Sequence, residues 1–161
     1  MTDSGAGREA VMLRAGVPAD LDSLVVLEQT AFAGDRLSRR SLRSFLRSTS
    51  ARLIVAERGG RVVGYCLVLT PAGRSLARLY SIATAADYRG KGLGGHLLDA
   101  AEQAASARGC AELGLEVRHD NAAAIALYLR RGYVEHARIS DYYEDGAAAI
   151  RMRKSLEIGR F

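Results

Sequence analysis

The sequence has no tryptophan, two prolines, two cysteines and three histidines among its 161 residues. Cys66 and Cys110 stand alone, which excludes a disulfide framework or a paired-cysteine metal site, and we expect both to be buried rather than nucleophilic. The histidines are scattered and lack cysteine or aspartate partners at ligand spacing, so no metal is expected. This cysteine usage is typical of a reducing, cytoplasmic setting.

Long apolar runs are also missing. No stretch of about 18 apolar residues occurs, so no membrane span is expected. The opening MTDSGAGREA has no hydrophobic core of a signal peptide. We predict a flexible polar tail over residues 1–9 and a single domain over 10–161. This domain is long enough to form a hydrophobic core without disulfides or a structural metal.

The composition that remains is globular, with 48% hydrophobic and 25% charged residues. The formal net charge of +5 favours anionic partners such as nucleic acid, acidic protein or a phosphate-bearing cofactor, and does not choose among them. No aromatic residues are interleaved with the basic ones in a nucleic-acid-binding pattern, so specific nucleic-acid binding ranks low.

Hydrophobic periodicity predicts an α/β (α+β) chain with the element order β-α-α-β-β-β-α-β-α-β-β. A hairpin is expected where two β-branched runs flank Arg-Gly-Gly-Arg, and Gly109 is expected to end the helix that follows the glycine-rich stretch. Asp20 is a candidate N-cap for the first helix. The expected strands are 11–15, 52–58, 61–69, 76–84, 111–118, 133–140 and 148–154, and the expected helices begin near 20, 38, 93 and 121.

The stretch YRGKGLGGHLL, residues 88–98, contains the spacing G-x-G-x-x-G of dinucleotide-binding loops. A Rossmann domain is disfavoured because the preceding strands are joined by hairpins, and a P-loop because no Lys-Ser/Thr pair follows the glycines. A glycine-rich turn that opens a helix can cradle an anion, and Arg89 and Lys91 add positive charge. The alternative is a tight strand–helix connection whose glycines only supply positive φ.

The same stretch resembles the acyl-CoA-binding signature Arg/Gln-x-x-Gly-x-Gly/Ala of the GNAT superfamily of N-acetyltransferases, with Arg89, Gly92 and Gly94 in register. LYSIAT before it and LEVRHDNAAAIALYLRRGY after it resemble that family in the same order. The resemblance implies the GNAT fold: one mixed, mostly antiparallel sheet of six to seven strands with a central splay and about four helices. In this register Gly90 and Gly95 match the dinucleotide spacing by chance.

The resemblance also implies acetyl-CoA as co-substrate. Its pyrophosphate would lie on the amides of Leu93, Gly94 and Gly95, and its pantetheine arm along the splayed strand. The implied coenzyme A-binding residues are Ile82, Ala83, Thr84, Arg89, Gly90, Lys91, Gly92, Leu93, Gly94, Gly95 and Asn121.

Alternation along AELGLEVR places Leu113, Leu115 and Val117 on one face and Glu116 on the other. From the residues alone, Glu116 is either a solvated strand carboxylate or a catalytic base. LEVR followed by Asn121 resembles the RimI-like amino-terminal acetyltransferases of ribosomal proteins, in which the matching glutamate is the base.

Asn121 and Tyr128 share one face of the helix that begins near residue 121. Local physics allows Asn121 to be only the N-cap and Tyr128 to be only a core aromatic. The resemblance implies instead that Asn121 contacts coenzyme A and that Tyr128 donates a proton to the departing thiolate.

DYYEDG, residues 141–146, predicts a turn, and two adjacent tyrosines in an extended chain would point to opposite sides. The segment is either a decorated hairpin or an acceptor-binding loop, as Tyr-Tyr-x-Asp-Gly in the N-terminal acetyltransferases implies. Candidate acceptor-binding residues are Tyr142 and Tyr143, together with Phe32 at the start of the segment between the first two helices.

The segment FAGDRLSRRS departs from the RimI-like group, because the Pro-Trp-like element common there is missing. A helical stripe of arginines is expected beside it and is either a solvated face or a site for an acidic acceptor. Its members are Arg36, Arg39 or Arg40, Arg43 and Arg47.

The sequence thus predicts an acetyl-CoA-dependent N-acetyltransferase that acts on a primary amine, expected to be a protein or peptide N-terminal α-amino group, by direct attack in a ternary complex. The alternatives are acetylation of a small amine, polyamine or lysine side chain, and a non-catalytic acyl-CoA-binding regulatory domain. The expected state is a monomer or homodimer without membrane contact.

Overall fold

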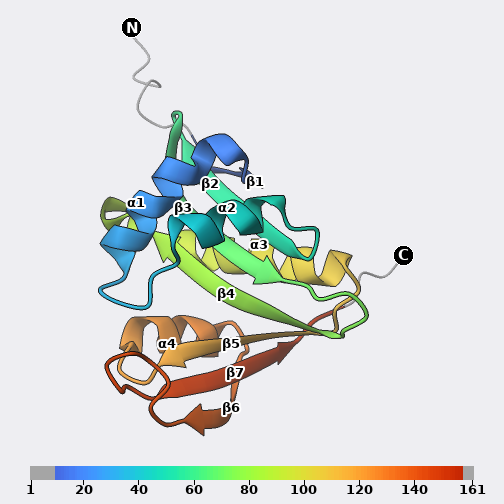
Figure 1. Cartoon of the computed structure of the whole chain (residues 1–161). Helices are drawn as coiled ribbons and strands as arrows, with labels where there is room; N and C mark the ends of the chain where they lie inside the picture. Colours follow the sequence, from blue (N-terminus) through green and yellow to red (C-terminus); the bar gives the residue numbers. More distant parts are fainter. Residues whose placement is uncertain (1–9, 158–161) are drawn as a thin grey trace, which may run out of the picture.

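A computed structural model describes residues 10–157 of the chain, and the predicted tail over 1–9 lies outside them. One seven-stranded sheet runs through the molecule in the order β1-β2-β3-β4-β5-β7-β6, with helices on both sides (Figure 1). The strands are β1 (Met12–Ala15), β2 (Ala51–Arg58), β3 (Arg61–Leu69), β4 (Leu76–Thr84), β5 (Glu112–Arg118), β6 (Val134–Ile139) and β7 (Ala149–Ser155). The helices are α1 (Leu21–Ala31), α2 (Arg39–Arg47), α3 (Leu93–Ala107) and α4 (Ala122–Arg130), with short 3-10 turns at Pro18–Asp20 and Ala86–Tyr88.

Hairpins build the first half of the sheet, as the sequence predicts. β2 and β3 pair antiparallel around Gly59 and Gly60, whose φ angles of 56° and 78° suit the turn that joins twisted strands. β1 pairs with β2, and β4 with β3, both antiparallel. The mixed, mostly antiparallel sheet is therefore confirmed.

The sheet splays between β4 and β5. These two strands pair in parallel over three positions only, from Leu76↔Glu112 to Arg78↔Gly114, and then diverge (Figure 1). β4 also bulges at Tyr80, because Leu67 of β3 faces Ser81 while the next residue, Val68, faces Leu79. The bulge twists β4 away from β5 at the point where pairing ends.

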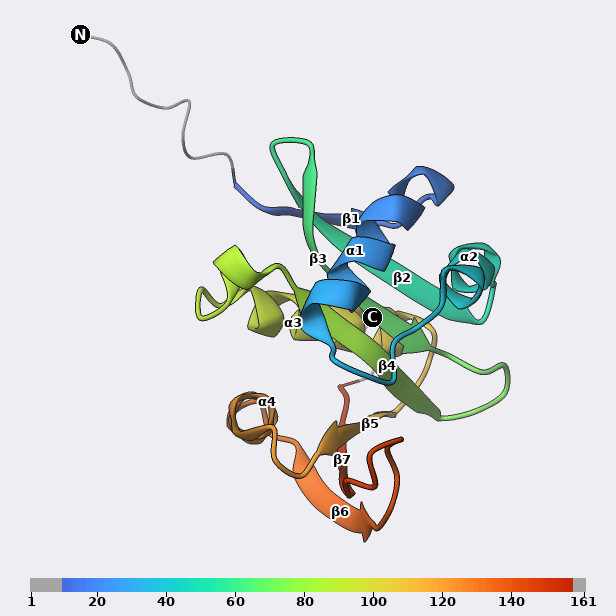
Figure 2. The same ribbon diagram turned by 60° about the vertical axis from the view of Figure 1, so that its left-hand side comes forward.

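The helices cover both faces of the sheet (Figure 2). α1 and α2 bury Leu24, Leu27 and Leu42 against one face, and α3 buries Leu97 and Leu98 against the other. The apolar side chains of β5 join the cluster under α3, together with α4. The predicted alternation of β5 is therefore confirmed, and it turns Glu116 toward the opposite face.

Helix ends follow the sequence signals with one exception. Ser38 caps α2 by accepting a hydrogen bond from the Ser41 amide at 3.0 Å, and Gly109 follows α3 with a φ of 81°. Asp20 stands at the N-cap position of α1 but makes no capping bond to that helix. Its carboxylate instead pairs with Arg14, whose hydrogen bonds lower the pKa of Asp20.

Both cysteines are buried, as expected, and burial raises the pKa of Cys66 to about 12. Among the helices of residues 10–157, none is long and apolar enough to cross a bilayer.

Candidate active site

The glycine-rich stretch forms a turn that opens α3, which is the geometry of an anion site. Gly92 is the N-cap residue, with a φ of 82°, and α3 begins at Leu93. Among the described residues, nothing accepts a hydrogen bond from the amides of Leu93, Gly94 or Gly95. These free N–H groups lie at the positive end of a 15-residue helix and suit a pyrophosphate.

Gly90 and Gly95 differ in what the structure asks of them. Gly90 has a φ of 74°, a conformation that side chains disfavour. A Cβ at Gly95 would meet the guanidinium of Arg131, the movable end of a side chain that pairs with Asp99. Neither feature depends on a dinucleotide-binding motif, so the match to that spacing stays without a function here.

The free edge of β4 follows the splay. Ile82, Ala83 and Thr84 pair with β3 on one side, at Cys66, Tyr65 and Gly64. On the other side β5 contributes no partner beyond Arg78 within the described chain. The main-chain groups of this edge are therefore open to an extended ligand that hydrogen-bonds as a strand does.

Glu116 is not a solvated strand carboxylate. Its side chain is 11% exposed and lies between two arginines from neighbouring strands. Arg78 Nε of β4 donates to one carboxylate oxygen at 3.0 Å, and Arg151 Nε of β7 donates to the other at 3.2 Å. Sequence reasoning missed both arginines, because each is separated from Glu116 by more than 30 residues.

Arg78 extends this network to the loop between β6 and β7. Its Nη2 donates to the Tyr142 hydroxyl at 3.0 Å, and its guanidinium lies 5.3 Å from the ring centre of Tyr80. One arginine thus connects the bulge of β4, the carboxylate on β5 and a predicted acceptor-binding tyrosine. Strand alternation was the available signal, since it puts Arg78 on the same face as Tyr80.

The ring of Tyr128 is a core aromatic, whereas its hydroxyl has surroundings of its own. Its ring is buried and meets Tyr133 edge-on at 5.7 Å. Its hydroxyl has no hydrogen-bond partner in the described residues, yet no buried side-chain oxygen there is unsatisfied, so the oxygen reaches the surface. Burial, with a smaller effect of Tyr143, raises the pKa of Tyr128 to about 12.

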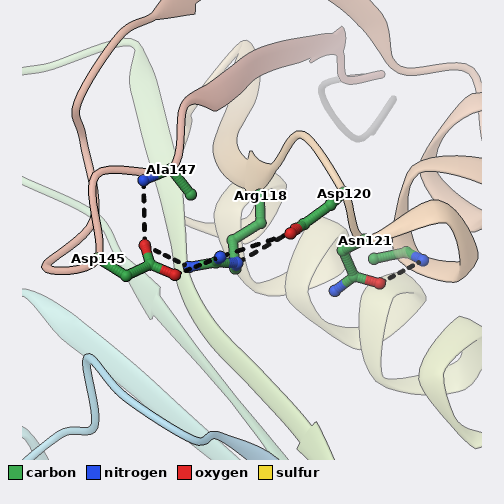
Figure 3. Close-up of polar contacts among 6 residues, drawn as sticks. Arg118, Asp120, Asn121, Asp145 and Ala147 are labelled. Atoms are coloured by element: carbon green, nitrogen blue, oxygen red, sulfur yellow. Dashed lines mark hydrogen bonds and ion pairs between the residues drawn. The ribbon is translucent and has the colours of Figure 1, made fainter.

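Asn121 acts as the N-cap of α4, since its side-chain oxygen accepts from the Ala124 amide at 3.2 Å (Figure 3). Next to it, Arg118 bridges Asp120 and Asp145 and so ties the end of β5 to the 141–148 loop (Figure 3). The hydrogen bonds that Asp145 accepts from Arg118 and from the Ala147 amide lower its pKa to about 2. The exposed Asn121 amide nitrogen remains available as a donor.

The two tyrosines of the 141–148 loop are not in extended backbone, which was the condition for their pointing to opposite sides. The amides of Tyr142 and Tyr143 both donate to the Ala147 carbonyl, which makes the segment a tight turn rather than an extended strand. Their rings therefore contact edge-on, with centres 4.9 Å apart. Tyr143 is half-buried, and burial, with smaller effects of its neighbours Tyr142 and Glu116, raises its pKa to about 12.

The 32–38 segment closes the other side of this region. The Glu144 amide donates to Asp35 Oδ1 at 3.4 Å, so the loop after α1 meets the loop before β7. Phe32 ends α1 and packs half-buried in the core cluster beneath it. Its carbonyl accepts from Arg36 Nε at 2.6 Å.

The predicted arginine stripe is shorter than expected. Arg36 precedes α2 and bonds the carbonyls at the end of α1, while Arg39 pairs with Asp22 at 2.6 Å. The stripe therefore reduces to Arg40, Arg43 and Arg47 on the exposed side of α2. Helical spacing could not show that α2 begins only at Arg39.

A second carboxylate, Glu28 of α1, is buried between the 32–38 segment and the sheet, and the sequence did not single it out. It accepts hydrogen bonds from the hydroxyls of Tyr65 and Ser81 and from the Leu37 amide, the last two at 3.1 and 2.8 Å. Glu28 thereby fastens the 32–38 segment to the sheet. Its place beside Leu27 on the apolar side of the helix was the signal available in the sequence.

Comparison with known proteins identifies the fold. Residues 21–133 match the Acetyltransferase (GNAT) family. The chain belongs to the GNAT acetyltransferase family. An uncharacterized N-acetyltransferase of Methanocaldococcus jannaschii is 35% identical over 136 residues, which cover 84% of this chain and 85% of that protein. The [ribosomal protein bS18]-alanine N-acetyltransferase of Escherichia coli is 46% identical over 67 residues, 42% of this chain and 45% of that protein.

Solved structures agree with this GNAT assignment. The ribosomal-protein-S18-alanine N-acetyltransferase from Escherichia coli superposes with a TM-score of 0.84 at 29% identity, over 94% of this chain and 97% of that one. Ard1 from Thermoplasma volcanium gives a TM-score of 0.84 at 27% identity, over 92% and 99%. The expected GNAT fold, the resemblance to the ribosomal-protein acetyltransferases and the expectation of an acetyltransferase are confirmed.

No group of three metal-ligating side chains occurs within residues 10–157.

Proposed function

We propose that this GNAT protein transfers acetyl from acetyl-CoA to the N-terminal α-amino group of a protein or peptide, by direct attack in a ternary complex. The observation that carries the proposal is the splay between β4 and β5, with Glu116 beside it and an open anion site at its far end. The ribosomal-protein acetyltransferases among its relatives support the choice of acceptor.

The residues of the loop and of β4 suit acetyl-CoA, which would supply the acetyl group as an activated thioester. The amides of Leu93, Gly94 and Gly95 would hold the pyrophosphate, with Arg89 and Lys91 adding charge. The open edge of Ile82, Ala83 and Thr84 would hold the pantetheine arm, and the free amide nitrogen of Asn121 would add one donor. No metal takes part in this proposal.

Glu116 is the proposed base for the acceptor ammonium. An α-amino group has a pKa near 8, so its deprotonation at pH 7 costs about 1.4 kcal/mol, whereas a lysine costs about 4–5 kcal/mol. A carboxylate has about four lone-pair sites, and the arginines occupy two of those on Glu116. Either of the two remaining lone-pair sites can accept the proton of the acceptor ammonium through one bridging water.

Tyr128 is proposed to act on the sulfur that departs. With a pKa of about 12, full transfer of its proton to a thiolate of pKa about 8.5 would cost roughly 5 kcal/mol. A hydrogen bond from its free hydroxyl to the developing thiolate avoids that cost. The proposed role therefore narrows from proton donor to hydrogen-bond donor.

Thiol release from acetyl-CoA, measured over N-terminal peptides, lysine peptides and polyamines, tests the proposal. Glu116→Gln is expected to lower kcat on the N-terminal peptides by about 10²-fold or more while acetyl-CoA affinity is retained. Glu112→Gln is the matched control, because Glu112 lies on the same strand face but pairs with Arg153 at 3.9 Å. Equal kcat for wild type and Glu116→Gln would contradict the role of Glu116, and turnover of polyamines alone would contradict the proposed acceptor.

A further inference from the structure

Glu116 has two positively charged partners and, within residues 10–157, no second acid between them. Arg78 and Arg151 flank this single carboxylate, so the three groups together carry a formal charge of +1. Glu116 is 11% exposed, whereas the two arginines are 42% and 38% exposed. The excess positive charge therefore faces the surface, above a largely covered carboxylate.

Both guanidinium groups keep donors that nothing uses. Each gives only its Nε to Glu116, and Arg78 gives Nη2 to the Tyr142 hydroxyl. Among the described residues, no hydrogen bond is made by Nη1 of Arg78 or by either Nη of Arg151. Half-exposed guanidinium nitrogens without partners are suited to bind a carboxylate.

Orientation of Glu116 does not require this surplus. One guanidinium already balances one carboxylate, and Arg153 on the same strand shows the ordinary arrangement, with Glu112 as its single acidic neighbour at 3.9 Å. Arg78 and Arg151 share one acid between them. A second carboxylate would balance the remaining positive charge of these two arginines.

We infer that Arg78 and Arg151 bind a carboxylate of the acceptor, so that the preferred acceptor is an α-amine with an acidic group close to it. An N-terminus that begins with aspartate or glutamate has this chemistry, and so does a free acidic amino acid. A polyamine has the opposite charge and is disfavoured at the same site. The inference rests on the proposed function, since it assumes that the amine reacts beside Glu116.

Initial rates on peptides that differ only at the first residue test the inference. The panel consists of C-terminally amidated peptides that begin with Asp, Ala or Lys, together with free aspartate to tell the two sources apart. We expect the wild-type enzyme to favour the Asp over the Ala peptide by about tenfold or more in kcat/KM, with the Lys peptide below both. The preference should weaken as salt rises.

The Asp-to-Ala ratio separates recognition from a merely structural role. Arg78→Gln and Arg151→Gln are expected to bring the ratio toward one, whatever they do to the absolute rates, and Arg151→Lys to retain part of it because the charge remains. Arg153→Gln removes the same charge two residues away and should leave the ratio unchanged.

The outcomes are distinguishable. Acetylation of all peptides without an Asp preference, or a preference that survives both Gln variants, overturns this inference and leaves the proposed function standing. Preference for free aspartate over every peptide supports the carboxylate site and overturns the protein acceptor. Absence of turnover on the whole panel overturns both.

Discussion

The ring and the hydroxyl of Tyr128 differ in what they contribute to the stability of the fold. The ring belongs to the buried cluster under α3 and α4, where it contributes packing. The hydroxyl contributes no hydrogen bond to any described residue, so the folded state gains nothing from it. A phenol oxygen that does nothing for stability is available for catalysis.

Tyr128→Phe is therefore expected to change the free energy of unfolding by less than about 0.5 kcal/mol and to lower kcat by about 10²-fold. Urea unfolding and steady-state kinetics measure the two quantities. Tyr133→Phe is the matched control: it removes the 3.1 Å bond to Glu102, should cost about 1 kcal/mol of stability, and should leave kcat unchanged. Wild-type kcat in the Tyr128→Phe variant would contradict the role of the hydroxyl.

Single residues were predictable from the sequence where neighbours along the chain decide their position. Alternation suffices to turn Glu116 away from Leu115 and Val117, and a helix start suffices to make Asn121 a cap. The partners of Glu116 come from two other strands, and no local pattern reports which strands pair with β5. The contacts of Arg78 and Arg151 with Glu116 could be recognised only once the order of strands in the sheet was known.

The turn before α3 is the element whose backbone matters most for the proposed co-substrate. Gly92 has a φ of 82°, and no atom lies near the position of a Cβ there. A side chain at this position is therefore disfavoured by the backbone conformation and not by steric contacts. Strain here acts directly on the amides of the first turn of α3.

Gly92→Ala is expected to cost about 1 kcal/mol of stability and to weaken acetyl-CoA binding several-fold, as measured by denaturant unfolding and by titration calorimetry. Gly73→Ala provides a matched control, because Gly73 has a φ of 71° and equally open surroundings in the loop between β3 and β4. It should cost the same stability without a change in affinity. Equal loss of affinity in both variants would speak against an anion site at α3.

The 141–148 loop shows where element prediction from sequence fails. Asp-Gly correctly predicted a turn, but the turn begins earlier, since both tyrosine amides already bond Ala147. The alternation rule holds only for extended backbone, so it could not apply to Tyr142 and Tyr143. The contact with Asp35 depends on a segment more than 100 residues away and leaves no local signal.

At the scale of the molecule, two core clusters lie on opposite faces of the sheet and share its strands. β3 contributes Cys66 and Val68 to one cluster and Tyr65 and Leu67 to the other. Because neither cluster can lose its strands without disturbing the other, the described residues should unfold as one cooperative unit.

Leu42→Ala and Leu98→Ala remove fully buried side chains from opposite clusters and are each expected to cost about 2–5 kcal/mol. Thermal and urea unfolding followed by circular dichroism should give one transition for each variant, shifted to lower midpoints. The exposed Leu129→Ala on α4 is the control and should shift the midpoint little. Two separate transitions in either core variant would contradict the single domain predicted from the sequence.

The order of elements along the chain was predictable, because hairpin turns, caps and glycines punctuate it. The order of strands across the sheet was not derivable from those signals. β7 lies between β5 and β6, so the last strand of the described residues fills an interior place in the sheet. That placement brings Arg151 next to Glu116, and no local pattern in the sequence reports it.

The divergence of β4 and β5 leaves a ladder unfinished in the middle of the sheet. A ligand that occupies the open edge of β4 would supply main-chain hydrogen bonds that the described part of the chain does not make for itself. Binding and folding would then be linked, because such a ligand binds the folded state alone. The unfolding midpoint would rise with the logarithm of free ligand concentration, by about 2.7 kcal/mol of stability at a hundred times Kd. Occupancy of the splay by a ligand could then be measured as an increase in the unfolding free energy of the whole sheet.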